Sequence, residues 1–274
     1  MSLKVGLQLY SVRDEMEKDM DKTLKAVKEM GYDYVEFAGY FDKTAEEVRA
    51  LLDKHELQCI SVHQVYDIFL TEPKESAEYL KTIGASYCAI PWMSPDKHKG
   101  SDAFEKTVEE IQQVSALLKE YGIQMLYHNH DFEFEKVDGK YKLDWLYETV
   151  GLSVINPEID TCWVRYAGED PCAYLKKYGD YIDVVHLKDF TAKNIAAGPV
   201  YELIGDNQAP KKSLEDNDFR FRPLGQGLQD MPAILATSEE VGAQYVIVEQ
   251  DKTYETPSLE AARQSREYLK KLEY

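Results

Sequence analysis

The sequence has few cysteines and few basic residues for its length. Four cysteines in 274 residues, none in a CxxC pair, exclude a disulfide scaffold and predict free thiols in a reducing cytoplasm. Lysine and arginine number 32 against 50 acidic residues, which gives a net charge of −18. Because nucleic acids and anionic membranes attract cationic proteins, neither is expected as a partner.

Long apolar runs are also missing. No stretch approaches the ~20 residues that span a bilayer, and the N-terminus lacks the apolar run of a secretory signal. The GxGxxG turn of dinucleotide-binding sheets is absent after the first predicted strand. The composition, with 44 % hydrophobic and 30 % charged residues, is that of an ordinary globular protein.

The chain does contain a repeated pattern, in which an amphipathic helical stretch precedes a short β-type run. Six of the runs follow a glycine, which suits a helix end because the residue there often needs a positive φ. The predicted strands are 3–9, 32–37, 57–63, 85–91, 123–128, 152–160, 180–189 and 243–250. Strands that alternate with helices form parallel sheets, and eight such units match a closed barrel. We therefore predict one α/β domain over 1–274, a (β/α)8 TIM barrel, with an open doubly wound sheet as the alternative.

Two connections are longer than a barrel requires. Residues 189–229 separate the seventh strand from the next helix, and residues 132–143 alternate around an Asp138-Gly139 turn typical of a hairpin. Both follow strands, on the barrel face where active sites are built, and are candidate lids.

Histidines cluster at the ends of predicted strands. Four of the six lie there, whereas His55 and His98 lie in polar segments and are expected to be solvated. Three acidic residues share these strand-end positions. The strand-end set is His63, His128, His130, His186, Glu36, Asp160 and Glu249.

Four of these residues predict a divalent-metal site. A mixture of imidazole and carboxylate ligands suits Mn, Zn, Co or Fe better than Ca, and Mg also remains open. The alternative is a buried hydrogen-bond and ion-pair network without metal, and His130 could replace His128 as a ligand. The predicted ligands are His128, Asp160, His186 and Glu249.

Several stretches in order along the chain resemble the xylose isomerase-like TIM barrels, a family of sugar isomerases, 3-epimerases, inosose dehydratases and endonuclease IV. The resemblance implies metal ligands at the ends of the fifth to eighth strands, which are the four positions above. It leaves the substrate open. The matching stretches are VGLQLYSVRD, YDYVEFAG, YHNHDFEF, EIDTCW, VHLKD, PLGQG and VIVEQD.

This sequence departs from the family at one position. Sugar epimerases that it resembles usually carry glutamate where it has His128, and their two glutamates exchange protons on opposite faces of the substrate. Without that matched pair, a one-base isomerase or a dehydratase or lyase on a keto-inositol or 3-keto-glycoside becomes an alternative to a metal-dependent sugar isomerase or epimerase.

Further residues at the strand ends are candidates for the chemistry. Glu249, His130 and Glu36 are predicted to transfer protons, although Glu36 could instead form a structural ion pair. The resemblance implies that Lys188 reaches the substrate, with a salt bridge as the alternative. Residues predicted to bind the sugar, or otherwise only to pack or form ion pairs, are His63, Trp92, Trp163 and Arg222.

The leading hypothesis is an enzyme that removes a proton α to the carbonyl of a small carbohydrate, with one divalent metal ion. A DNA endonuclease would need more metal ligands and a cationic face, and is disfavoured. A sugar-binding barrel without turnover is the non-enzyme alternative. The sequence leaves the sugar, its phosphorylation and any homo-oligomer open.

Overall fold

The computed structural model describes residues 3–195 and 217–274. Its centre is a closed barrel of parallel strands in the order β1-β12-β9-β8-β5-β4-β3-β2. Because β1 pairs with β12, the predicted (β/α)8 barrel is confirmed and the open sheet is wrong. The barrel strands are β1 (Lys4–Gln8), β2 (Tyr34–Phe37), β3 (Gln58–His63), β4 (Tyr87–Ile90), β5 (Gln124–His128), β8 (Ile155–Asp160), β9 (Val184–Leu187) and β12 (Tyr245–Val248).

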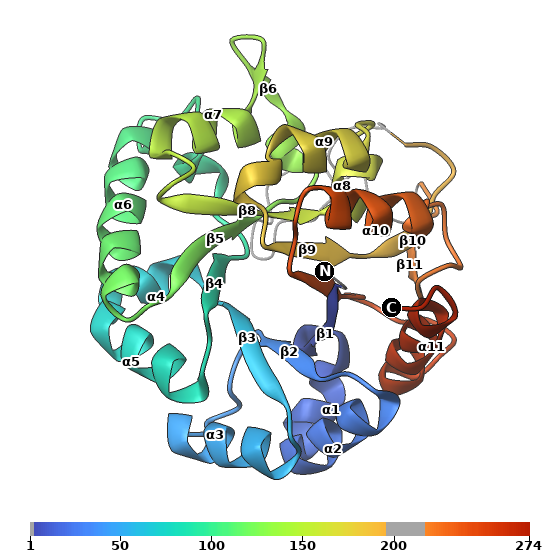
Figure 1. The fold of residues 1–274 in the computed structure, drawn as a ribbon. Helices are drawn as coiled ribbons and strands as arrows, with labels where there is room; N and C mark the ends of the chain where they lie inside the picture. Colours follow the sequence, from blue (N-terminus) through green and yellow to red (C-terminus); the bar gives the residue numbers. More distant parts are fainter. Residues whose placement is uncertain (1–2, 196–216) are drawn as a thin grey trace.

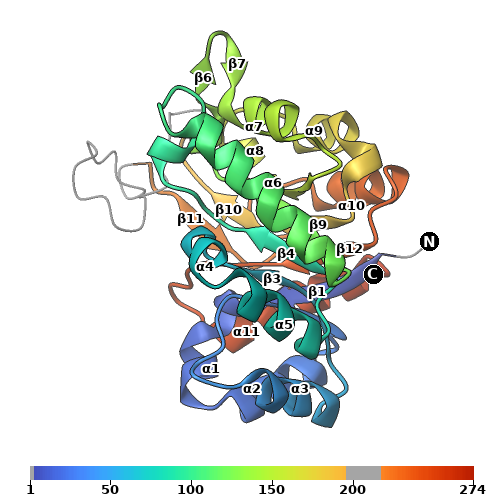
Figure 2. The same ribbon diagram turned by 90° about the vertical axis from the view of Figure 1, so that its left-hand side faces the viewer.

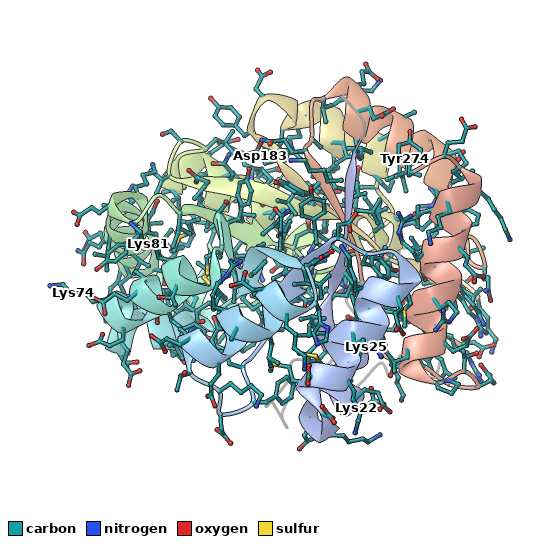
Figure 3. The ribbon with its side chains drawn as sticks, turned by 60° about the horizontal axis from the view of Figure 1, so that its bottom comes forward. Lys22, Lys25, Lys74, Lys81, Asp183 and Tyr274 are labelled. Carbon is teal, nitrogen blue, oxygen red and sulfur yellow. The ribbon has the colours of Figure 1, made fainter. Side chains whose placement is uncertain are left out.

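Helices surround the barrel as an outer ring (Figure 1). Their apolar faces pack on the strands, and charged side chains such as Lys74 and Lys81 on α5 lie on the exposed face (Figure 3). The helices are α1 (Arg13–Lys18), α2 (Met20–Met30), α3 (Ala45–Lys54), α4 (Tyr66–Thr71), α5 (Pro73–Ile83), α6 (Phe104–Glu120), α7 (Lys142–Val150), α8 (Thr161–Tyr166), α9 (Pro171–Lys177), α10 (Met231–Glu240) and α11 (Ser258–Lys271). Among the described residues, no helix is long and apolar enough to cross a membrane.

The glycines that precede strands mostly end helices as predicted. Gly31, Gly84, Gly122, Gly151 and Gly242 have φ values between 77° and 98°. Gly179 is the exception, because it begins a short 3-10 turn and its φ is not positive. A Cβ at Gly179 would lie 3.2 Å from the side chain of Val241, so close packing is the reason for glycine there.

The connections after β5 and β9 build additional structure at one end of the barrel. Strands β6 (Lys136–Val137) and β7 (Lys140–Tyr141) form the predicted hairpin, with φ values of 53° at Asp138 and 80° at Gly139. After β9, strand β10 (Asp189–Thr191) pairs with β11 (Arg220–Arg222). In Figure 2 both chain ends lie on the right, and this ribbon extends toward the left. Residues 196–216 of the predicted lid lie outside the described residues, and both lid roles remain predictions.

The start of the β9 connection is organised around one buried carboxylate, that of Asp189. It accepts backbone N–H groups from Phe190, Gly225, Gly227 and Gln229 at 2.9–3.1 Å. A Cβ at Gly227 would lie 2.1 Å from Oδ1 of Asp189, so the loop can wrap the carboxylate only with glycine there. This cradle fixes the loop that follows Lys188.

Candidate metal centre and active site

Polar side chains fill the barrel at the C-terminal ends of the strands in two layers. Glu158 and Asp160 alternate on β8, so both point inward, and both are fully buried. The deeper layer, here called the inner cluster, consists of Glu36, His63 and Glu158. The layer nearer the mouth, the outer cluster, consists of Asp160, Lys188, Glu249 and Asp251.

The outer cluster gathers three carboxylates around one ammonium group. Nζ of Lys188 lies 3.0 Å from Oδ2 of Asp160, 3.0 Å from Oε2 of Glu249 and 3.1 Å from Oδ1 of Asp251. Burial opposes the charge of Lys188, but the carboxylates prevail and raise its pKa well above the usual value. The cluster still has more negative than positive charge, which favours a further cation.

His186 joins the two clusters through its two ring nitrogens. Its Nδ1 lies 2.9 Å from Oε2 of Glu249, and its Nε2 lies 2.7 Å from Oε2 of Glu36. Gln8 fixes the same Glu36 oxygen by donating a hydrogen bond from Nε2 at 2.8 Å. A carboxylate behind a histidine sets its orientation and tautomer, so Glu36 holds Nδ1 of His186 toward the outer cluster.

His128 also lies between the inner and outer clusters, at longer distances from their carboxylates than His186. Its Nε2 lies 3.4 Å from Oδ2 of Asp160, and its Nδ1 lies 3.3 Å from Oε2 of Glu158. In the inner cluster, Nε2 of His63 lies 2.8 Å from Oε2 of Glu158 and 3.2 Å from Oε2 of Glu36. His128 and His186 therefore each present one ring nitrogen to the inner cluster and the other to the outer cluster; they are called the linking histidines below.

The two inner carboxylates have different pKa values. Burial opposes the charge of Glu36, but His63 and His186 hold its pKa at about 2. Burial and the neighbouring charge of Glu36 raise the pKa of Glu158 to about 7. The second negative charge of this cluster is therefore costly without a proton or a cation nearby.

The pKa values of the ionisable groups near the pocket mouth also differ from one another. Burial opposes ionisation of Glu249, but Lys188 and His186 hold its pKa well below the usual value. Burial raises the pKa of Asp251 to about 7 even though Lys188 acts in the other direction. Burial lowers the pKa values of His128 and His130 well below the usual range, so both imidazoles are neutral at pH 7.

A pocket of about 340 Å³ opens onto the outer cluster. Glu249 and Asp251 follow β12 and Lys188 follows β9, whereas His128 and His130 come from the end of β5, which is separated from β9 by β8 in the barrel. The size and mixed polarity of the pocket suit a small ring that carries several hydroxyl groups. The remaining lining residues are Tyr10, Ala38, His63, Val65, Pro91 and Trp92.

A model of the xylose isomerase-like TIM barrel family matches residues 24–272. The chain belongs to this family. It is 25 % identical to an inosose dehydratase of Geobacillus kaustophilus, over 92 % of this chain and 87 % of that protein.

Two solved structures of the xylose isomerase-like fold superpose on nearly the whole chain. A sugar phosphate isomerase/epimerase from Parabacteroides distasonis has a TM-score of 0.78 at 20 % identity and covers 98 % of this chain and 94 % of its own. The IOLI protein, whose structure holds a zinc atom, has a TM-score of 0.70 at 17 % identity and covers 98 % of both chains. At these identities the likeness shows the fold alone.

The four predicted metal ligands of this xylose isomerase-like barrel come together. One ligand atom from each of His128, Asp160, His186 and Glu249 lies within 4.8 Å of the others, and all four side chains are buried. Buried carboxylates and imidazoles are a donor set that suits zinc or another first-row divalent metal. Burial opposes the charge of His186, but Glu36 and Glu158 raise its pKa well above the usual value, so it would lose a proton when it binds metal. These residues therefore fit the metal, and Lys188 is the ammonium that shares their carboxylates.

The other predicted site residues are divided between the pocket and the protein interior. His63, His130, Lys188 and the half-buried Trp92 line the pocket. Glu36 is fully buried, is not among the lining residues, and contacts His186, one of the predicted ligands. None of these placements tests a catalytic role.

Trp163 and Arg222 are not among the residues that line the pocket. Trp163 is fully buried, and its ring stacks on Phe219 at 5.5 Å between centroids. It also contacts two pocket residues, because its ring lies 5.7 Å from the ring of His130 and 5.7 Å from Nζ of Lys188. Nη1 of Arg222 on β11 lies 3.5 Å from Oε2 of Glu255, an acid at the surface. Sugar binding by either residue stays a prediction.

The expectation that two histidines are solvated is wrong. His98 is 1 % exposed, its Nε2 lies 3.2 Å from the carbonyl oxygen of Met93, and burial lowers its pKa to about 4. The side chain of His55 is 9 % exposed and contacts Asp21. In both cases the tertiary fold covers a histidine whose sequence neighbours are polar.

Sequence reasoning missed three residues of the site, and two had a detectable signal. Glu158 precedes Asp160 by two positions, and Asp251 follows Glu249 by two, so strand alternation puts each on the inward face. Gln8 ends β1 and could have been found as the matching strand end, but its role depends on its contact with Glu36.

Proposed function

We propose that this protein is a metal-dependent lyase that removes water, or another β-leaving group, from a cyclic polyhydroxylated ketone. The observation that carries the proposal is the unequal set of groups around the pocket, with carboxylates after β12 and neutral imidazoles at the end of β5. An elimination needs one group that takes a proton and a different group that gives one, whereas an epimerisation is served by two matched bases.

The similarity to inosose dehydratase over most of the chain agrees with this assignment, since that relative's name describes a dehydration of a cyclic keto-polyol. The replacement of the usual epimerase glutamate by His128 also favours it. The pocket volume of about 340 Å³ is large enough for one six-membered ring.

The metal would be held by His128 Nε2, Asp160, His186 Nδ1 and Glu249. When bound, it would supply Lewis acidity toward the carbonyl and a neighbouring hydroxyl of the substrate. Glu36 and Gln8 would keep His186 in the correct tautomer for this role.

We assign the base to Glu249, whose pKa is held low and which lines the pocket. Its carboxylate would take the proton from the carbon next to the ketone, and the electron pair left behind would form the enolate. Lys188 would remain an ammonium throughout, because three carboxylates raise its pKa. It would lend positive charge to the developing enolate oxygen.

We assign the second step to Asp251 and His130, which also line the pocket. As the carbonyl re-forms from the enolate, a double bond forms between the α and β carbons, and the bond from the β carbon to its hydroxyl breaks. That hydroxyl would take a proton from Asp251, whose pKa of about 7 lets it carry one near neutrality, and leave as water. The neutral imidazole of His130 would orient the leaving hydroxyl through a hydrogen bond.

Isomerisation or epimerisation of a keto-sugar is the second candidate. It shares the first step, and it is favoured by the presence of proton-transfer groups from both β12 and the end of β5 around one pocket. In that case His130 would return a proton to carbon instead of holding a leaving group.

A panel assay separates the candidates. Metal-loaded protein is incubated with an inosose, a 3-keto-glycoside and several ketoses in D2O, and products are followed by NMR. The lyase proposal expects loss of one hydroxyl or glycosidic substituent from an inosose or 3-keto-glycoside. A rearranged sugar with solvent deuterium and no lost substituent would instead establish isomerase or epimerase activity, and binding without any reaction would establish a sugar-binding barrel.

A further inference from the structure

The inner cluster has the spacing of a metal coordination shell. Around Oε2 of Glu158, the nearest nitrogens are those of His63 at 2.8 Å, His128 at 3.3 Å and His186 at 3.5 Å. Ligands of a tetrahedral zinc ion, bound at about 2.0–2.2 Å, lie roughly 3.3–3.6 Å from one another. One ligand atom from each of these four residues lies within 4.8 Å of the others.

Two buried carboxylate oxygens of the inner cluster have no hydrogen-bond partner among the described residues, Oε1 of Glu36 and Oε1 of Glu158. Nδ1 of His128, which lies beside them, has none either. Nδ1 of His128 lies only 3.3 Å from the other oxygen of Glu158, but the two do not align as a hydrogen bond. Polar atoms that are close but not aimed at one another are the pattern expected when both face a third body between them.

The two carboxylates of the inner cluster, Glu36 and Glu158, are both fully buried, and the ion pairs of Lys188 in the described part of the chain reach only the outer carboxylates. Burial opposes the charge of His63 and His186, but the two acids raise the pKa of both, so protons on these histidines or a divalent cation in their place can balance the cluster. Three imidazoles surround these two acids, with ring centroids 4.6–5.1 Å apart. Two carboxylates and three imidazoles form a donor set that suits zinc or cobalt.

We propose that the inner cluster, together with Nδ1 of His128 and Nε2 of His186, is a divalent-cation site distinct from the outer quartet. His128 and His186 serve the outer position through their other nitrogens. A histidine that binds metal through one nitrogen keeps its proton on the other, so a single cation occupies either position but not both. The outer carboxylates can remain with Lys188 while the cation is inside.

Zinc binding to variants without the outer carboxylates tests this site. The Asp160→Asn, Glu249→Gln double variant keeps both linking histidines and all three inner residues. We expect it to retain about one zinc ion per chain after buffer exchange, because the inner ligands are intact. Zinc content is measured by mass spectrometry and affinity by calorimetry, with circular dichroism as the check of folding.

Adding His63→Ala or Glu158→Gln to the double variant should weaken zinc binding by more than the ~10–100-fold typical of a lost second-shell partner. Glu133→Gln is the matched control, since Glu133 is equally buried but contacts Tyr127 and the His130 backbone instead. It should leave zinc binding unchanged in the same background.

Two results would overturn the inner site. One is a folded double variant that binds no zinc, and the other is unchanged zinc affinity after both His63→Ala and Glu158→Gln. Zinc binding is measured without substrate, so failure of this site is distinguishable from failure of the proposed lyase reaction.

Discussion

Asp160 ends β8 and Asp189 begins β10, shortly after the neighbouring strand β9; both acids are fully buried, but their surroundings differ. The carboxylate of Asp189 accepts four backbone N–H groups of the loop that it organises. Oδ1 of Asp160 accepts N–H groups at the start of α8, but its Oδ2 faces Lys188 and His128.

The contrast shows that burial alone does not mark a functional acid. Backbone amides cannot move away without unfolding their loop, so an acid that they saturate is structural. Side chains such as lysine and histidine can rearrange, so an acid that faces them can exchange one cation for another. We therefore assign Asp189 to stability and propose that the acids of the outer cluster take part in the chemistry.

The largest effect is expected for Asp160→Asn. It removes the charge of a proposed metal ligand, so turnover should fall by roughly 10²–10⁴-fold, the usual range for a lost charge-stabilising group. Because asparagine is also a good N-cap, the free energy of unfolding should change by less than about 1 kcal/mol. Steady-state kinetics and urea unfolding of the same sample give both numbers, and a large loss of stability would break the contrast.

Asp189→Asn should lower stability strongly and leave metal binding unchanged. Its amide group cannot accept all four N–H groups, and the buried donors left without a partner should cost about 3 kcal/mol of unfolding free energy. Zinc content per folded chain should stay at the wild-type value. Urea unfolding and metal analysis measure the two quantities, and loss of zinc at unchanged stability would contradict the structural assignment.

His98 sharpens the comparison because it is a buried ionisable group whose ring contacts a backbone carbonyl oxygen, that of Met93, rather than a charged group. Its pKa is about 4 when folded and 6.5 when unfolded, so its contribution to stability is full above pH 6.5 and falls as the pH drops toward 4. Between pH 7 and pH 5 the loss should be about 2 kcal/mol. His98→Gln should remove that part of the acid sensitivity in urea unfolding, and an unchanged pH dependence would exclude it.

Two glycines give a matched pair, and the substitution at Gly139 has the smallest expected effect. Gly227→Ala would place a Cβ 2.1 Å from the Asp189 carboxylate, whereas the space at Gly139 is open and only its φ of 80° disfavours alanine. We expect losses of about 2–3 kcal/mol for Gly227→Ala and about 1 kcal/mol for Gly139→Ala. Equal losses by thermal or urea unfolding would mean that the cradle does not constrain its loop.

Much of this architecture could be predicted from the sequence, because strand and helix periods and the glycines between them are local signals. The four proposed ligands could be placed together because a closed parallel barrel brings its strand ends to one face. The burial of Trp163 could not be predicted from the sequence, because its partners Phe219 and Phe221 come from a distant connection. The burial of His98 depends on Phe132, which packs against its ring and is far along the chain.

The exchange of the substrate α-proton with solvent deuterium tests the central claim most directly. Wild-type protein and Glu249→Gln, loaded with the same metal and checked for equal metal content, are incubated in D2O with the ketone that the panel identifies. We predict deuterium at the carbon next to the ketone for the wild type and at least ~100-fold slower exchange for Glu249→Gln. Glu255→Gln at the surface is the control and should exchange normally. Equal exchange rates in wild type and Glu249→Gln would contradict the assignment of the base to Glu249.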